Sequence, residues 1–232
     1  MSSNIIKISA LLLLTTTLST GCIIHVGGDG HSGEYSGDNN GDISSVLGSL
    51  EVGEGKQVGD VSSVNGKVSI NEHVSAQDVD TVNGSIEIAN HVSVKDVETV
   101  NGSIETGHHF MAQGSVSTVN GDINILAYSI VGGDISTVNG DIKLNKVAVT
   151  GDISTSSGSI TLENNSTVAG DIVYESHNEN AWGWNNDQHK LPRLVIDSDS
   201  TVEGRIILRQ KVSLAIENQQ LMDKVEYDYP QQ

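Results

Sequence analysis

Cysteine, proline and aromatic residues are scarce in this chain, which holds one cysteine, 2 prolines and 3% aromatic residues. A lone cysteine excludes an intramolecular disulfide, so packing and hydrogen bonds have to stabilise the fold. The low aromatic content excludes a core built from rings, and the apolar residues are mostly Val, Ile and Leu, which favour strands. Basic residues are also few. There are 12 of them against 30 acidic ones, and the net charge of −18 argues against nucleic acid as a partner.

The main apolar run lies near the start, ISALLLLTTTL, and it is too short for a stable membrane span. The small residues STG follow it and lead to Cys22, the only cysteine. This arrangement resembles the lipobox of bacterial lipoproteins, although Ser19 stands where a leucine is usual. The resemblance implies a signal peptide over 1–21 and a lipidated Cys22 that anchors the protein without crossing the membrane. The alternative is an ordinary signal peptide with an incidental cysteine.

Segment 22–40 has little apolar content after its first residues, which predicts a flexible tether between the lipid and a folded body. The residue after Cys22 is Ile23 rather than Asp, which in Gram-negative lipoproteins implies sorting to the outer membrane. We therefore expect a location in the cell envelope, with the membrane as a partner through the N-terminal lipid.

From Gly41 onward, two sets of residues repeat with one period. The first set is acidic, with a serine at one position, and its steps are 18 or 19 residues: Asp42, Asp60, Asp78, Asp96, Ser115, Asp134, Asp152 and Asp171. The second set is a glycine, Gly48, Gly66, Gly84, Gly102, Gly121, Gly140 and Gly158, with Asn65, Asn83, Asn101, Asn120 and Asn139 before five of them. One Asn-Gly pair predicts a hairpin. A fixed spacing over so many copies instead predicts a solenoid, because each coil must stack on the last.

The apolar positions share this period, and a coil of such length buries them only by stacking on its neighbours. The segments between turns are too short for helices and rich in β-favouring residues. We therefore predict an all-β fold, a single-stranded parallel β-helix over 41–216 with right-handed winding favoured, and a polar cap or tail over 217–232. The Asn-Gly pairs would form corners, because glycine and asparagine tolerate a positive φ, and stacked asparagines would hydrogen-bond from coil to coil.

One coil is longer than the others. The segment SITLENNSTVAGDI is echoed by RLVIDSDSTVEGRI 34 residues later, instead of 18 or 19. This spacing places an insertion near 175–191, in a region that holds both tryptophans, Trp182 and Trp184. Their rings are candidates for stacking on a sugar, and covering an edge of the β-helix is the simpler interpretation.

Runs of GDISTVNGDI after a lipoprotein signal, then a Trp-containing insertion and VIDSDSTVEGRIIL, resemble a family of bacterial adhesin-like β-helix lipoproteins of unknown function. The resemblance covers most of the predicted mature chain and implies architecture, because the family has no agreed catalytic residues to transfer. A more distant likeness is to bactofilins, whose VxGxI repeats form β-helices that polymerise end to end. STVAGDI and STVEGRI fit that cadence, whereas the Asn-Gly repeats do not.

Two columns of side chains are candidates for holding a divalent cation. The repeated aspartates would stack along one face, where a cation such as Ca²⁺ would relieve their repulsion, and capping of backbone N–H groups is the simpler interpretation. His73, His91 and His109 would also stack, with Tyr128 in the next coil, and could bind Zn²⁺, Ni²⁺ or Cu²⁺. Exposed turn histidines are the simpler interpretation of this column, because ligands in a straight column diverge.

Enzyme signatures are missing: the chain has no GxSxG, no HExxH and no phosphate-binding loop with lysine. We therefore expect a non-enzymatic, lipid-anchored structural or adhesin-like protein of the cell envelope that contacts an envelope glycan or protein. We expect no cofactor beyond the candidate divalent cation. Two alternatives stay open. One is a carbohydrate-binding or carbohydrate-cleaving β-helix that uses Trp182 and Trp184, and the other is a self-assembling rod of the bactofilin type.

Overall fold

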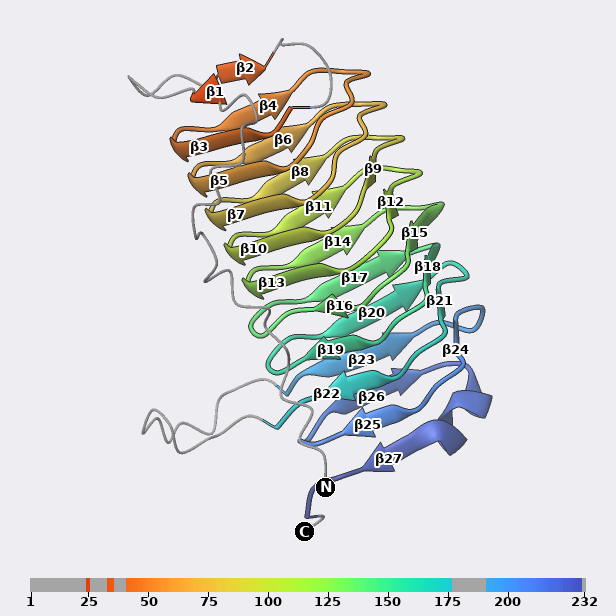
Figure 1. The fold of residues 1–232 in the computed structure, drawn as a ribbon. Coiled ribbons are helices and arrows are strands. Elements are labelled where there is room, and N and C mark those ends of the chain that lie inside the picture. The colour runs from red at the N-terminus through yellow and green to blue at the C-terminus, as the bar shows by residue number, and fades with distance from the viewer. Residues whose placement is uncertain (1–23, 26–32, 36–40, 177–190, 231–232) are drawn as a thin grey trace, which may run out of the picture.

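The computed structural model describes residues 24–25, 33–35, 41–176 and 191–230, and in these ranges the chain winds as a parallel β-helix (Figure 1). The strands form an 11-stranded, a 10-stranded and a 6-stranded sheet, called sheets A, B and C. All strand pairs are parallel, and each strand pairs with strands one coil away. The predicted fold class is confirmed.

The strands of each sheet stack in the order in which they follow one another along the chain. Sheet A contains β1 (Ile24–His25), β3 (Ile43–Leu47), β5 (Val61–Asn65), β7 (Val79–Asn83), β10 (Val97–Asn101), β13 (Val116–Asn120), β16 (Ile135–Ser136), β19 (Ile153–Thr155), β22 (Ile172–Tyr174), β25 (Ile206–Leu208) and β27 (Val225–Tyr227). Sheet B contains β2 (Gly33–Tyr35), β4 (Leu50–Val52), β6 (Val68–Ile70), β8 (Ile86–Ile88), β11 (Ile104–Thr106), β14 (Ile123–Ile125), β17 (Ile142–Asn145), β20 (Ile160–Glu163), β23 (Arg193–Ile196) and β26 (Ser213–Ile216). Sheet C contains β9 (Ser93–Val94), β12 (Met111–Ala112), β15 (Ser129–Val131), β18 (Val147–Val149), β21 (Thr167–Val168) and β24 (Thr201–Val202).

A typical coil takes one strand from each sheet, such as β10, β11 and β12, and turns at three corners. The Asn-Gly corner joins sheet A to sheet B and holds the repeated Asn-Gly pairs. The second corner joins sheet B to sheet C and is described below as the left-handed corner. The third, the Asp corner, leads from sheet C back to sheet A and holds the repeated aspartates.

The core is built from alternating side chains of all three sheets. In the coil of β10 to β12, Val97, Ile104 and Ala112 are all buried, and their neighbours along each strand face outward. Val97 pairs with Val79 of the preceding coil and Val116 of the following one, so like residues stack through the interior. Burying one such Val or Ile contributes about 1.5–3 kcal/mol, and each coil depends on its neighbours for that burial.

Glycine is required at the Asn-Gly corner for a different reason from the one predicted. Of the glycines that the structure describes, only Gly48 and Gly55 have a φ in the left-handed region, at 107° and 70°. The other corner glycines need no positive φ. A Cβ built on Gly102 would instead lie 2.0 Å from the carbonyl oxygen of Gly84 in the preceding coil. Close backbone approach between coils excludes a side chain there, so the positive-φ explanation was wrong.

A column of hydroxyl side chains lies buried beneath the Asn-Gly corner. Its members in successive coils are Ser45, Ser63, Thr81, Thr99, Thr118, Thr137 and Thr155. Thr81 and Thr99 donate to the carbonyl oxygens of Gly66 and Gly84, at 3.2 and 3.0 Å. These bonds satisfy polar groups inside the β-helix and tie consecutive corners together.

A short 3₁₀ helix, η1 (Gln219–Lys224), and strand β27 lie at the C-terminal end of the stack (Figure 1). Leu221 of η1 is buried in the hydrophobic core, and Val225 and Tyr229 pack against it. The Lys224 ammonium donates to the carbonyl oxygens of Val202 and Glu203, at 2.7 and 2.8 Å. Val202 ends β24, the last strand of sheet C, and Glu203 follows it, so this segment covers the apolar interior and satisfies an open strand edge.

Several predicted features fall in or near undescribed parts of the chain. Cys22, most of segment 22–40 and the two tryptophans, Trp182 and Trp184, lie outside the described residues. Within 22–40, strands β1 and β2 pair with β3 and β4 and carry sheets A and B one step further. None of the described helical segments has the length and apolar character needed to cross a bilayer.

Candidate metal centre at the left-handed corner

The second corner of each coil repeats one unusual backbone conformation. In successive coils its residues with positive φ are Gly55, His73, His91, His109, Tyr128 and Lys146, and then both Asn164 and Asn165. A positive φ is uncommon for residues other than glycine, and histidine and asparagine are among those that adopt it more readily. The conformation directs one exposed side chain per coil outward from the same place on the surface, so a column forms along the β-helix.

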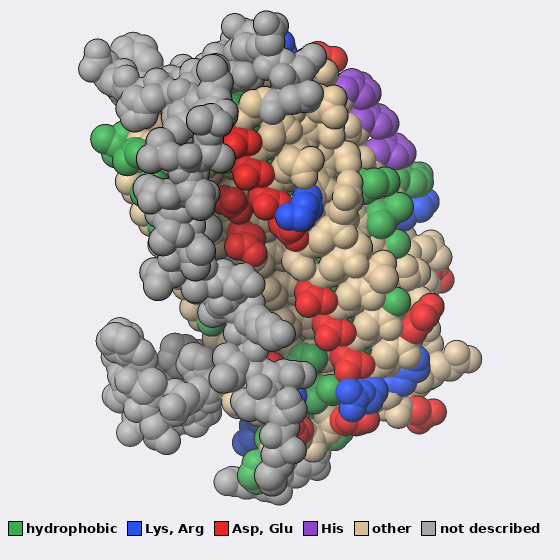
Figure 2. Space-filling view, in the orientation of Figure 1, with side chains coloured by type: hydrophobic (Ala, Val, Ile, Leu, Met, Phe, Trp, Pro, Cys, Tyr) green, Lys and Arg blue, Asp and Glu red, His purple; other side chains and the backbone are tan. Residues whose placement is uncertain are grey.

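The first rings of this column stack face to face. The ring centroids of His73 and His91 lie 5.0 Å apart, those of His91 and His109 4.6 Å, and those of His109 and Tyr128 5.1 Å. The planes differ by only 7–12°. The Lys146 ammonium then lies 4.4 Å from the centroid of the Tyr128 ring, a cation–π contact. Figure 2 shows the histidines as a continuous row on the surface.

The stack alone is poorly suited to binding one metal ion. An imidazole nitrogen coordinates in the plane of its ring, at about 2.0–2.1 Å from zinc. A metal in the plane of His91 would therefore lie much too far from the planes of His73 and His109, whose centroids are 5.0 and 4.6 Å away. The three predicted histidines are thus brought together, but their nitrogens do not converge.

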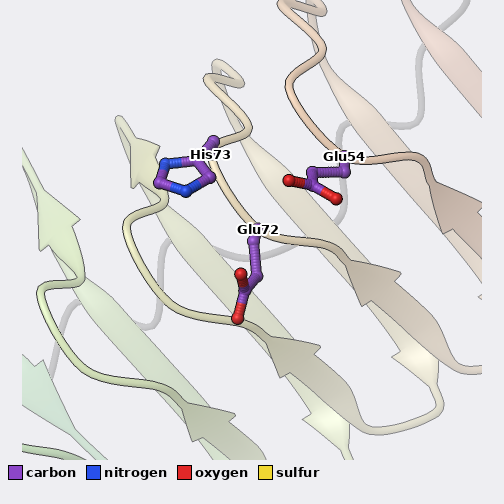
Figure 3. A group of neighbouring side chains, drawn as sticks. All are labelled: Glu54, Glu72 and His73. Atoms are coloured by element: carbon purple, nitrogen blue, oxygen red, sulfur yellow. The ribbon is translucent and has the colours of Figure 1, made fainter.

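Convergence occurs at the first histidine instead, with two glutamates that the sequence did not single out. Carboxylate oxygens of Glu54 and Glu72 and a ring nitrogen of His73 all lie within 4.8 Å of one another (Figure 3). Among the residues that the structure describes, no other set of at least three His, Cys, Asp or Glu side chains meets this condition. Glu54 comes from the turn after β4, and the other two come from the turn after β6.

The glutamates belong to a second column, one residue before the left-handed position. Its members are Glu54, Glu72, Asn90 and His108. The Asn90 amide nitrogen donates to Oε1 of Glu72 at 2.8 Å, and Oδ1 of Asn90 accepts the backbone N–H of His108 at 2.9 Å. This column has the same 18-residue spacing as the histidine column, but only its first two members are acidic, so it does not stand out in the sequence.

The aspartates of the Asp corner serve the backbone. Oδ1 of Asp134 accepts the backbone N–H of Asp152 at 2.8 Å, and Oδ1 of Asp152 accepts that of Asp171 at the same distance. Ser115 takes the same role with its hydroxyl, which accepts the N–H of Asp134 at 3.1 Å. These side chains therefore cap the corner of the next coil, as in the simpler of the two interpretations made from the sequence.

A denser acidic patch lies where the Asp corner meets sheet A, and Figure 2 shows it as a cluster of acidic side chains around one lysine. Asp80 and Glu98 face outward on paired strands. Burial, followed by the charge of Glu98 and of nearby aspartates, raises the pKa of Asp80 to about 7. The Lys95 ammonium lies 3.0 Å from Asp78 and 3.4 Å from Asp96, so it neutralises part of the patch.

Asparagine side chains at the Asn-Gly corner form a hydrogen-bonded ladder. The amide nitrogens of Asn83, Asn101, Asn120 and Asn139 each donate to Oδ1 of the asparagine one coil earlier, at 2.8–2.9 Å. These amides are exposed, but they are used within the ladder. The corner is therefore structural rather than a surface prepared for a ligand.

Tyr174 marks the coil into which the insertion enters. It continues the buried hydroxyl column after Thr155 and is fully buried. Its phenolic oxygen accepts the backbone N–H of Ile160 at 3.1 Å and donates to the carbonyl of Arg193 at 3.0 Å. In the preceding coil the corresponding N–H, that of Ile142, bonds directly to a backbone carbonyl. The phenol thus bridges a backbone gap where the insertion returns to sheet B, and burial raises its pKa.

Side chains of the next coil hold the entry to the insertion. The Arg209 guanidinium donates to the Glu175 carboxylate at 2.6 Å, and both groups are partly buried. The Gln210 amide donates to the carbonyl oxygens of Ser156 and Glu175. No pattern in the sequence pointed to this arrangement, because none of these contacts repeats from coil to coil.

The chain was also compared with known proteins. No protein-family model, no curated protein and no solved structure matches it.

Proposed function

We propose that this protein is a lipid-anchored, non-enzymatic β-helix of the cell envelope, attached to the outer membrane through Cys22, with a structural or adhesin-like role. The observation that carries the proposal is the lipobox-like sequence at Cys22, immediately ahead of a fold built of repeated coils. A stack of coils with long columns of like side chains offers extended surfaces for contact with a glycan or a protein.

The start of the β-helix supports an anchor at one end of the rod. Ile24 of β1 pairs with Ile43 of β3, and Cys22 lies two residues before Ile24. A lipid on Cys22 would therefore hold the first coils close to the membrane surface, and the remaining coils would extend away from it. The net charge of −18 would keep the rod clear of anionic head groups.

The C-terminal end favours a rod that does not polymerise as bactofilins do. The interior is covered there by Leu221, and the outermost strand of sheet A carries Glu226, with Asp228 and Pro230 just beyond it. Charges and proline on an edge strand oppose pairing with another chain. Light scattering that showed concentration-dependent filaments would contradict this part of the proposal.

The experiment that tests the anchor compares the full chain with its Cys22→Ser variant in cell fractionation and fatty-acid labelling. We expect the unaltered protein in the outer-membrane fraction with label attached, and the variant without label and released from that fraction. Recovery of the unaltered protein from the cytosol, or label-free membrane attachment in both, would overturn the proposal.

A second candidate function is carbohydrate binding through the insertion. The observation that favours it is the fixed base of the insertion, held by Tyr174 and by the Arg209–Glu175 ion pair. A firmly held base would project Trp182 and Trp184 from a constant place on the rod. Binding to a panel of envelope glycans that survives a Trp182→Ala, Trp184→Ala double substitution would exclude these rings as the binding site.

A further inference from the structure

We propose that Glu54, Glu72 and His73 form a binding site for a divalent transition-metal ion, with zinc as the representative ion. The site uses one ring of the histidine column and both glutamates of the neighbouring column. Of the other rings in the stack, only His91 lies directly against His73. The inference is independent of whether Cys22 carries a lipid.

His73 is held in a defined orientation before any ion arrives. Its left-handed backbone, with φ of 58°, fixes the direction of the side chain, and one face of its ring rests on His91. A preorganised ligand loses little conformational freedom on binding, which favours affinity.

The space beside His73 on the side of the preceding coil is open. The left-handed position of that coil is Gly55, and a Cβ built there would meet no atom within 4 Å. The stack therefore ends at His73 among the described residues, and Figure 3 shows Glu54 and Glu72 beside this ring.

The carboxylates supply charge and flexible donors. Oε1 of Glu72 accepts the Asn90 amide at 2.8 Å, which orients this carboxylate and leaves its other oxygen available. Tetrahedral zinc with bonds of about 2.0–2.2 Å places its ligand atoms roughly 3.4 Å apart. Ligand atoms now within 4.8 Å reach that spacing through small rotations of exposed glutamate side chains.

The donor set selects the class of ion. One imidazole and two carboxylates, completed by water, suit zinc and its first-row neighbours. Calcium requires six to eight oxygen ligands, and magnesium retains its water shell, so neither gains much from an imidazole nitrogen. The net charge of −18 raises the local concentration of any divalent cation, so the test must separate coordination from general attraction.

The test is a zinc titration of the purified full chain by calorimetry, with calcium in parallel and with the imidazole ¹⁵N signals followed by NMR. We expect one zinc site, a shift of the His73 ring nitrogens at the first equivalent of zinc, and no such shift with calcium. The Glu54→Gln and His73→Asn variants should each weaken zinc binding at least tenfold. Asparagine at position 73 preserves tolerance of the left-handed backbone.

Two matched controls keep the test decisive. Glu105→Gln removes the same charge from an exposed position of sheet B, and His109→Asn removes a ring from the same stack away from the glutamates. Both should leave zinc affinity within about twofold of the unaltered protein, because neither residue is a ligand. The proposal fails if zinc binds no better than calcium, or if the controls lose as much affinity as the Glu54 and His73 variants.

Discussion

The Asn-Gly corner and the left-handed corner turn the same chain in the same coils, yet they constrain it in different ways. At the Asn-Gly corner the neighbouring coil is so close that Gly102 has no room for a Cβ. At the left-handed corner Gly55 has open space around it, and later coils carry histidine, tyrosine or lysine there. Contact between coils sets the residue at the first corner, whereas only backbone conformation limits the second.

The difference shows where a repetitive fold can acquire chemistry. The asparagines and glycines of the first corner are used in bonds and contacts from coil to coil, so substitution there damages the stack. At the second corner a residue other than glycine adds only the backbone strain of a positive φ, and its side chain stays exposed. The stacked rings and the Glu54–Glu72–His73 group are both found at this second corner.

The largest effect that would test this difference between the corners comes from adding one methyl group at each of them. Gly102→Ala brings a Cβ to 2.0 Å from the Gly84 carbonyl oxygen, so we expect a loss of about 3 kcal/mol or more in the free energy of unfolding. A Cβ at Gly55 has no atom within 4 Å, so Gly55→Ala adds only the strain of a φ of 70°. We expect it to lower the free energy of unfolding by about 1 kcal/mol. Denaturant unfolding measures both, and equal losses would contradict the distinction.

The repeat period made the β-helix predictable, because two sets of residues at a common spacing leave few other folds. The same period underlies the stacked corner glycines and the stacked histidine rings. The reason for the glycines was wrong, since the distance between stacked backbones is not visible in a sequence. Glu54 and Glu72 were missed because a pair of glutamates is too short a column to stand out. Tyr174 was missed because its hydrogen bond to the Ile160 N–H is needed only in the coil that contains the insertion, and a contact made once leaves no repeat in the sequence.

A second test concerns that repair. Tyr174→Phe keeps the buried ring and removes the hydroxyl that joins the Ile160 N–H to the Arg193 carbonyl. Two buried backbone groups lose their partner, and we expect a loss of about 2–3 kcal/mol in the free energy of unfolding. Tyr128→Phe is the matched control, because Tyr128 is exposed, and it should change stability very little. An unchanged free energy of unfolding in Tyr174→Phe would show that the two hydrogen bonds of the phenol do not stabilise the fold.

A third test uses pH at the acidic patch. The pKa of Asp80 is raised to about 7, so the folded state favours its protonated form, and the free energy of unfolding should fall as pH rises from about 4 to 8. Asp80→Ser copies Ser62, its neighbour in the column, and removes this cost. We expect the variant to gain about 1–2 kcal/mol at pH 8, after allowance for screening by solvent, and nothing at pH 4. A gain that did not depend on pH would point to packing rather than charge.

The smallest expected effect concerns the buried hydroxyl column beneath the Asn-Gly corner. The hydroxyl of Ser63 is buried and has no hydrogen-bond partner among the described residues, whereas Thr99 in the same column donates to Gly84. Ser63→Ala should therefore raise the free energy of unfolding by about 0.5–1 kcal/mol, and Thr99→Ala should lower it by about 1 kcal/mol. Thermal unfolding measures whether each variant is more or less stable than the unaltered protein. A less stable Ser63→Ala variant would show that the Ser63 hydroxyl makes a stabilising hydrogen bond after all.

The closed C-terminal end has a consequence for how such a molecule changes over generations. In the regular part of the rod the strands of each coil pair only with those of its two neighbours, so duplication or deletion of one 18-residue unit there would leave the remaining strand pairings intact. The segment from η1 to β27 then fits whichever coil comes last, provided that Leu221 meets an apolar interior and Lys224 a free strand edge. Gain or loss of one coil would therefore change the length of the rod by about 4.8 Å, the spacing between neighbouring strands, without altering either end.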